Sequence, residues 1–254
     1  MPINYVRRLT ASERTQTANR HLGFALSFVA GATNAGGFLA VRQYTSHMTG
    51  VVSAMADNIA LGGTTLVLAG AGALLSFVLG AAFTAVLVNH ARRRRLYSEY
   101  ALPLLVEAVL LICFGLLGAR LSRIEGLFVP LTVMLLCFIM GLQNALVTKL
   151  SNAEIRTTHV TGIVTDIGIE LGKLFYWNMG SAGQPKVLGD RDRLGLLLTL
   201  LASFFVGGVV GAAGFKYVGY LSTVPLAMVL IVLAVIPTFD DVSTLARRFR
   251  KPRR

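Results

Sequence analysis

Thr45-Ser-His-Met-Thr-Gly-Val-Val-Ser53 occurs a second time, as Thr157-Thr-His-Val-Thr-Gly-Ile-Val-Thr165. The two stretches align without gaps, and five of their nine positions are identical. Two further blocks flank the motif in the same order. They are Gly31-Ala-Thr-Asn34-Ala35 with Gly141-Leu-Gln-Asn144-Ala145, and Ser76-Phe77-x-x-Gly80 with Ser203-Phe204-x-x-Gly207. Three matched blocks in one order predict an internal duplication of the chain.

The composition is that of a polytopic membrane protein. Of the 254 residues, 54% are hydrophobic and only 14% are charged, and the mean hydropathy is +0.66. A soluble domain of this size needs more charge on its surface. The net charge of +12 does not indicate nucleic-acid binding, because the Lys and Arg residues lie between the apolar runs, where membrane orientation signals occur. Cys113 and Cys137 fall within apolar runs and predict no disulfide framework.

Six stretches are long and apolar enough to span a bilayer, which takes about twenty residues. They are His21–Val41, Thr64–His90, Leu102–Gly118, Leu127–Val147, Leu194–Gly214 and Tyr217–Pro237. The chain then divides into a polar basic arm (1–20), a first three-span repeat (21–119), a second repeat (126–238) and a basic tail (239–254). The arm has no apolar core, so we expect no cleaved signal peptide.

The positive charges predict the orientation. With both termini in the cytoplasm, 20 of the 24 Lys and Arg residues fall on the inner side, as the positive-inside rule requires. Four spans per half would move Arg92–Arg95 to the outer side, which the rule disfavours. Three spans per half is an odd number, so the two halves are expected to be inverted relative to each other, as in many transporters.

A short semi-apolar segment follows each motif, over Met48–Gly62 and Val160–Gly172. Both are too short and too polar for ordinary spans, so each is predicted to be a broken or re-entrant helix. The predicted fold is therefore an all-α transmembrane bundle of about six spans, built as two inverted three-helix repeats. The first motif enters from outside and the second from inside, so the two are expected to approach each other near the midplane.

The motif residues suit a polar site at two helix starts. The Thr-Ser and Thr-Thr pairs are N-cap types, the glycines allow close helix approach, and the histidines can donate, accept or titrate. The alternative is that the Thr and His side chains only cap helix ends in a loop. The residues concerned are Thr45, His47, Thr49 and Gly50, with Thr157, His159, Thr161 and Gly162.

The second segment carries more charge than the first. At about 100° per residue, His159, Asp166 and Glu170 share one helix face. Two ionised carboxylates one turn apart repel, so the pKa of one of them is expected to rise if the site is dry. This pattern predicts a proton or cation path. The alternative is an interfacial helix in which Glu170 pairs with Lys173.

Glu107 lies in the middle of an apolar run, where a carboxylate costs a few kcal/mol. It marks either a pathway or a buried hydrogen bond. Asn34 and Asn144 are duplicated in the first span of each half, and we expect them to be its partners across the bundle. Their alternative role is to hold helices together.

The quoted blocks resemble the YoaK-like bacterial membrane proteins, a family catalogued as a conserved domain of unknown function. The resemblance covers about His21 to Pro237. In that family Asn often follows the first Thr-Gly, whereas this chain has Val51. The resemblance implies a multi-pass bacterial inner-membrane protein and brings no substrate or activity.

We expect a transporter or permease that moves a small solute or ion, with possible proton coupling, between the two repeats. No enzyme motif, cofactor or metal site is predicted, and the expected partners are the lipid bilayer, the solute and a second copy of the chain. A non-transporting scaffold or regulatory subunit is the alternative. An intramembrane enzyme would need an acid–base pair within hydrogen-bond reach. The expected pathway residues are Thr45, His47, Thr49, Gly50, Thr157, His159, Thr161, Gly162, Glu107, Asp166, Glu170, Asn34 and Asn144.

Overall fold

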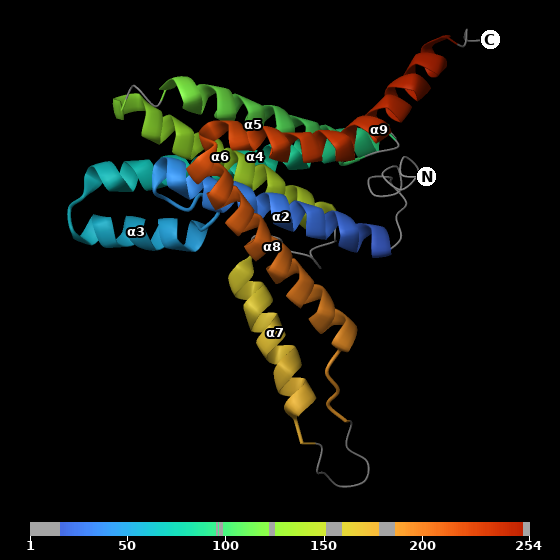
Figure 1. Ribbon diagram of the computed structural model, residues 1–254, viewed down its shortest axis with the longest axis horizontal. Coiled ribbons are helices and arrows are strands. Elements are labelled where there is room, and N and C mark those ends of the chain that lie inside the picture. Colours follow the sequence, from blue (N-terminus) through green and yellow to red (C-terminus); the bar gives the residue numbers. More distant parts are fainter. Residues whose placement is uncertain are drawn as a thin grey trace.

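The computed structural model describes residues 16–94, 96, 99–121, 125–150, 159–177 and 186–250. Over these ranges every regular element is a helix (Figure 1), which confirms the all-α class for the described part of the chain. The elements are α2 (Gln16–Val41), α3 (Met48–Ala60), α4 (Thr64–Arg94), α5 (Ala101–Leu121), α6 (Glu125–Leu150), α7 (Val160–Phe175), α8 (Arg191–Tyr217), the 3-10 helix η1 (Gly219–Ser222) and α9 (Thr223–Arg250).

Among the described residues, five helices are long and apolar enough to cross a membrane. They are α2, α4 and α8 over their full lengths, α5 over Ala101–Gly118, and α6 over Pro130–Leu150. The expected sixth span, Tyr217–Pro237, begins at a break, because Gly219 has a φ of 74° and η1 separates α8 from α9. The apolar stretch described there, Gly219–Val235, is shorter than the other five.

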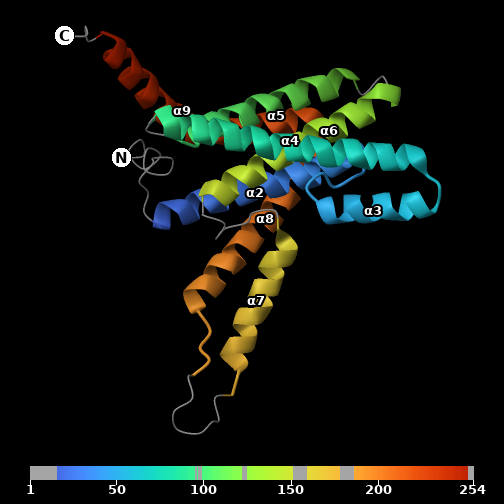
Figure 2. The same cartoon turned by 180° about the vertical axis from the view of Figure 1, so that it is seen from behind.

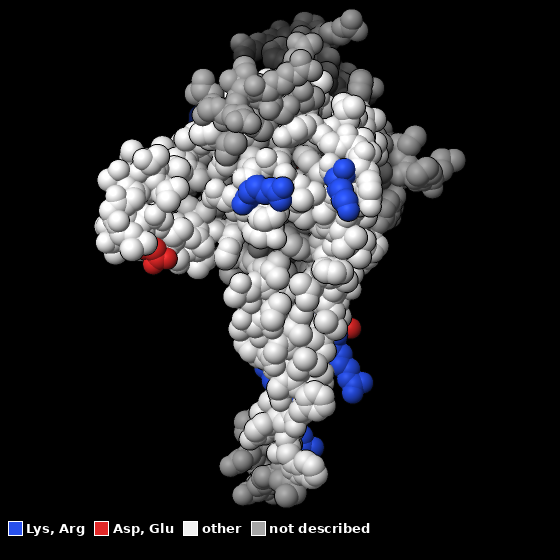
Figure 3. All heavy atoms as spheres, turned by 60° about the vertical axis from the view of Figure 1, so that its left-hand side comes forward, with Lys and Arg blue, Asp and Glu red and all other residues white. Residues whose placement is uncertain are grey.

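The outer surface suits contact with lipid. Large apolar side chains such as Leu68 and Phe205 are exposed by 73% and 69%, and the face in Figure 3 shows only isolated charged side chains. In water such a surface would be unfavourable, but hydrocarbon is the environment in which it belongs. The chain is therefore an integral membrane protein.

Three helix pairs make up the bundle: α2 packs along α8, α4 along α6, and α5 along α9 (Figures 1 and 2). The first pair joins the Gly31 block to the Ser203 block, and the second joins the Gly141 block to the Ser76 block. The repeated blocks therefore contact each other between the halves of the chain. Buried leucines of the three helix pairs, including Leu22, Leu104 and Leu146, are 0% exposed.

The two inter-half crossings use glycine in the same way. A Cβ added to any of four glycines, all within the repeated blocks, would collide with a backbone carbonyl of the facing helix. Close backbone approach of this kind is how small residues stabilise helix pairs in membranes. The contacts are Gly31 with Phe204, Gly141 with Phe77, Gly80 with Phe138, and Gly207 with Phe28.

Buried polar side chains add hydrogen bonds at the same crossings. Ser27 Oγ donates to the Leu200 carbonyl at 2.9 Å, and Thr84 Oγ1 donates to the Leu142 carbonyl at 3.0 Å. A third bond joins α6 to α2, where Gln143 Nε2 donates to the Leu26 carbonyl at 3.1 Å. Each of these donors would otherwise be buried without a partner.

Both short segments are helices, each packed beside the next long helix. α3 lies along α4, and α7 lies along the first half of α8, which projects away from the rest of the bundle (Figures 1 and 2). The two connections differ. α3 joins α4 through a tight turn at Leu61–Gly63, in which Gly62 has a φ of 76°, whereas residues 176–190 separate α7 from α8.

Candidate functional site

The two motif copies meet at one cavity. The beginnings of α3 and α7 face it together with α2, α4, α6 and α8, and its volume is about 430 Å³. We call it the central cavity. Five equivalent pairs from the two halves contribute to its lining: Asn34 with Asn144, His47 with His159, Met48 with Val160, Thr49 with Thr161, and Phe77 with Phe204. The other lining residues described are Tyr44 and Ser46.

The helix starts differ from the expected capping. His47 and His159 occupy the N-cap positions of α3 and α7, and neither makes a side-chain capping bond. Ser46 instead turns back to α2, where its Oγ donates to Asn34 Oδ1 at 2.9 Å. The expected role of the Thr-Ser pair as an N-cap is therefore wrong for the first copy. Thr157 and Thr158 lie outside the described residues.

Two other motif positions also differ from expectation. Gly50 and Gly162 do not admit a neighbouring helix, because a Cβ on Gly50 would meet the His47 ring, and a Cβ on Gly162 would meet only His159. Glycines of the flanking blocks, such as Gly31 and Gly141, admit a facing helix instead. Thr45 is 1% exposed, and its hydroxyl has no hydrogen-bond partner among the described residues.

Glu107 is not part of the central cavity as described. It is 0% exposed in α5, and neither carboxyl oxygen has a partner in the described part of the chain. The expected asparagine partners are engaged elsewhere. Asn34 Oδ1 accepts from Ser46, and Asn144 Nδ2 donates to the carbonyl of Met140 on its own helix at 2.8 Å. The prediction that they pair with Glu107 is wrong.

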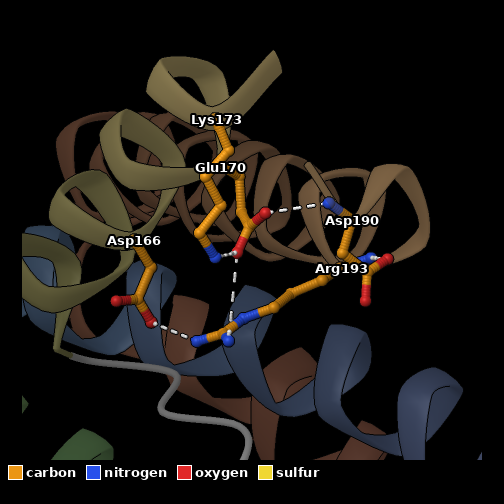
Figure 4. A network of polar contacts seen from close by, with 5 residues as sticks. All are labelled: Asp166, Glu170, Lys173, Asp190 and Arg193. Carbon is orange, nitrogen blue, oxygen red and sulfur yellow. Dashed lines mark hydrogen bonds and ion pairs between the residues drawn. The ribbon is translucent and has the colours of Figure 1, made fainter. Parts of the chain in front are cut away.

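The carboxylates of α7 form an ion network with α8 rather than an array facing the central cavity (Figure 4). Glu170 is 2% exposed. Its Oε1 accepts from Lys173 Nζ at 2.8 Å, and its Oε2 accepts from the backbone N–H of Asp190 at 2.9 Å. Arg193 Nη2 lies 3.2 Å from Asp166 Oδ2, and its Nη1 lies 4.0 Å from Glu170 Oε1.

This network lowers the pKa of Glu170, chiefly through the hydrogen bond from Lys173 and then through the backbone bond from Asp190. Each bond favours the ionised carboxylate. The expectation of a raised pKa is wrong for this residue. Both carboxylates of the predicted path are held in ion pairs, Glu170 with Lys173 and Asp166 with Arg193. The pairing with Lys173, which was the alternative, is the arrangement found.

Two further cavities lie beside the short helices, and they differ in polarity. The cavity beside α3 has a volume of about 470 Å³ and is lined mainly by apolar residues of α3, α4 and α6. The cavity beside α7 has a volume of about 700 Å³ and includes Arg20, Asp166 and Arg193. In the repeat alignment Asp166 replaces Ala54, and Arg193 replaces Leu66. The charges on α7 and α8 are therefore specific to the second half.

Several residues that line the central cavity are not among the pathway residues predicted from the sequence. Phe77 and Phe204 belong to the repeated Ser-Phe-x-x-Gly blocks, and this repetition is the sequence signal by which they could be predicted. Tyr44 has no such signal, and its ring stacks on Phe38 with centroids 4.5 Å apart. No group of three or more His, Cys, Asp or Glu side chains suited to a metal ion is found in the described ranges.

One comparison with known proteins identifies a family whose function is unknown. Residues 22–236 match the model of a family described as "Protein of unknown function (DUF1275)". A search among curated proteins and another among solved structures found no match. Because the matched region covers most of the chain, the protein belongs to the DUF1275 family.

Proposed function

We propose that this protein is a transporter or permease that moves a small solute through the central cavity. The observation that carries the proposal is the composition of that cavity, to which equivalent residues of both motif copies contribute. Transporters built from two repeats place their substrate site where the repeats meet, often beside broken helices. The starts of α3 and α7 provide such an arrangement.

The proposal includes two inverted repeats of three spans. In the repeat alignment α2 corresponds to α6, α4 to α8, and α5 to α9. The α2–α8 pair therefore corresponds to the α6–α4 pair, and the α5–α9 pair corresponds to itself. The glycine contacts exchange in the same way. With three spans in each repeat, both termini lie on the same side of the membrane, and the distribution of Lys and Arg supports the cytoplasmic side. The resemblance supports a bacterial inner membrane as its location.

His47, Thr49, His159 and Thr161 line the proposed pathway, and Asn34 and Asn144 stand at its sides. Asp166 and Glu170 belong to the ion network instead. No Asp or Glu is among the described residues that line the central cavity, so the proposed movement uses no carboxyl acid there.

Cysteine accessibility tests the proposal. Cys113 and Cys137 are replaced, and single cysteines are placed at Thr49 or Thr161, which are exposed and line the cavity. A membrane-impermeant thiol reagent is applied from each side separately. Labelling of both positions from both faces is expected, because an alternately exposed cavity opens to each side in turn.

Val52 and Val164 provide matched controls. They are one turn further along α3 and α7, are exposed by 50% and 51%, and lie outside the central cavity. We expect cysteines there to face hydrocarbon and therefore to stay unlabelled. Labelling of Thr49 and Thr161 from one face only would contradict transport and favour the scaffold or regulatory subunit.

No enzymatic activity is proposed. An intramembrane hydrolase or transferase would need an acid–base pair within hydrogen-bond reach, and Asp166, the nearest candidate acid for His159 on α7, binds Arg193. The arrangement therefore favours passage of a solute over chemistry on it.

A further inference from the structure

We infer that the central cavity takes an uncharged organic molecule with hydrogen-bonding groups on a flat, apolar ring. Its role as the transported solute rests on the proposed function, whereas its binding does not.

The described lining contains no Asp, Glu, Lys or Arg. Its polar groups are amides, hydroxyls and imidazoles, which exchange hydrogen bonds but supply no fixed countercharge. A charged molecule that leaves water for a site inside a membrane protein pays a large desolvation cost unless a countercharge meets it. An uncharged molecule needs only its hydrogen bonds replaced.

Charged side chains are present nearby but line a different space. Arg20, Asp166 and Arg193 line the cavity beside α7, and none of them is among the residues of the central cavity. The uncharged lining is thus a local property of the central cavity and not a consequence of the low charge content of the chain.

One polar group of the lining is available to a ligand. Asn34 Oδ1 is occupied by Ser46, and among the described residues no partner is found for the amide nitrogen of Asn34. An amide nitrogen donates two hydrogens. A carbonyl oxygen or a ring nitrogen on the ligand would accept one of them.

The size and the aromatic residues indicate a ring. A volume of about 430 Å³ is much larger than a bare monatomic ion and falls in the range of sites for small organic ligands. Phe77 and Phe204 enter from equivalent positions on α4 and α8. Aromatic rings bind other flat rings by offset stacking or edge-to-face contact.

Three probes of the same size separate the charge classes: nicotinamide is neutral, nicotinate is an anion, and 1-methylnicotinamide is a cation. Isobutyramide keeps the neutral carboxamide without the aromatic ring. Binding is measured by calorimetry on the full-length protein in nanodiscs. We expect nicotinamide to bind at least about tenfold more tightly than each of the other three, which corresponds to about 1.4 kcal/mol.

Two substitutions locate the binding. Phe204→Leu and Phe77→Leu should each weaken nicotinamide about tenfold by removing a ring from the lining. Phe205→Leu is the control, because Phe205 is the next residue of α8, is 69% exposed and lies outside the cavity. It should leave binding unchanged.

Equal or tighter binding of nicotinate or 1-methylnicotinamide would overturn the inference. So would the absence of nicotinamide binding at about 10 mM, or binding that is insensitive to both cavity substitutions. Failure of the proposed function is distinguishable. If nicotinamide binds but the cysteines are labelled from one face only, the binding inference holds and transport is excluded. If the cysteines are labelled from both faces but a charged probe binds more tightly, transport is supported and the binding inference is wrong.

Discussion

Glu170 shows how a buried carboxylate is accommodated at the edge of this bundle. It is 2% exposed, yet its oxygens receive Lys173 and the backbone N–H of Asp190. Its equivalent in the first half, Asn58, donates to the Ala54 carbonyl of its own helix at 2.7 Å. A buried charge is tolerated only when its hydrogen-bonding capacity is filled. The partners of the Glu170 carboxylate are Lys173 of α7, the backbone N–H of Asp190 in the connection that follows α7, and Arg193 of α8.

Glu170→Gln tests this residue. The substitution keeps the shape but removes the charge that Lys173 and Arg193 face, so α7 should separate from α8 more often. We expect faster amide hydrogen exchange in α7 and a melting temperature lower by a few degrees. Asp57→Asn in α3 is the control, because Asp57 is exposed. Unchanged exchange in α7 of the Glu170→Gln protein would contradict the structural role of the network.

The same contact predicts a pH dependence. Because its partners lower the pKa of Glu170, the stabilisation is fully present above the ordinary glutamate pKa of about 4.3. It is lost as the pH falls through the lower pKa of the folded state. Exchange in α7 should therefore stay slow from neutral pH to about 4.3 and rise below it. The measurement is exchange against pH, corrected for intrinsic rates, and the Glu170→Gln protein should lack this rise.

At the scale of the helix, the crossings α2–α8 and α4–α6 depend on glycine. Gly31 and Gly141 face backbone carbonyls across the interface, with no space for a Cβ. The hydrophobic effect supplies no drive between helices within lipid, so close packing and hydrogen bonds must hold the pair together. A single methyl group at a crossing is therefore expected to force two helices apart.

Gly31→Ala and Gly141→Ala should each destabilise the protein by about 1–3 kcal/mol, the usual cost of overpacking. The measurement is unfolding of the purified protein in mixed micelles. Gly195→Ala in α8 is the matched control, because nothing lies within 4 Å of a Cβ at that position. Alanine there should be neutral or stabilising by up to about 1 kcal/mol, since it favours helix over glycine. Equal effects at all three positions would rule out the crossing as the cause.

At the scale of the whole molecule, the halves depend on each other. α2 of the first half packs along α8 of the second, and α6 of the second packs along α4 of the first. Neither half contains the partner of its own first helix. The apolar core continues across this division, with Leu26, Leu104, Leu146, Leu200 and Leu230 in one cluster.

Separate expression of residues 1–121 and 125–254 tests this interdependence. Each fragment alone should be degraded or protease-sensitive, because its glycine-lined faces lack their partners. Co-expressed fragments should co-purify as a protease-resistant complex. The control is a split between residues 177 and 186, within the connection that follows α7, which should reassemble as well. If residues 1–121 resisted protease on their own, the result would contradict the dependence of α2 on its packing against α8.

The sequence by itself determined the features that depend on local composition and periodicity. Hydrophobic runs of sufficient length predicted where the apolar helices lie, within a few residues at most ends, because a spanning helix must satisfy its own backbone hydrogen bonds. The repeated motif located the starts of α3 and α7. It also indicated that the two copies approach each other, and both contribute to the central cavity.

The tertiary structure decided what depends on distance between helices. The sequence could not show that Asn34 binds Ser46 rather than Glu107, or that Asp166 binds Arg193 from α8, because partners far apart in the chain meet only after packing. For the same reason the glycines of the flanking blocks, and not those of the motif, proved to be the close contacts. Sequence spacing defines the face on which a side chain lies, whereas packing defines the group that it meets.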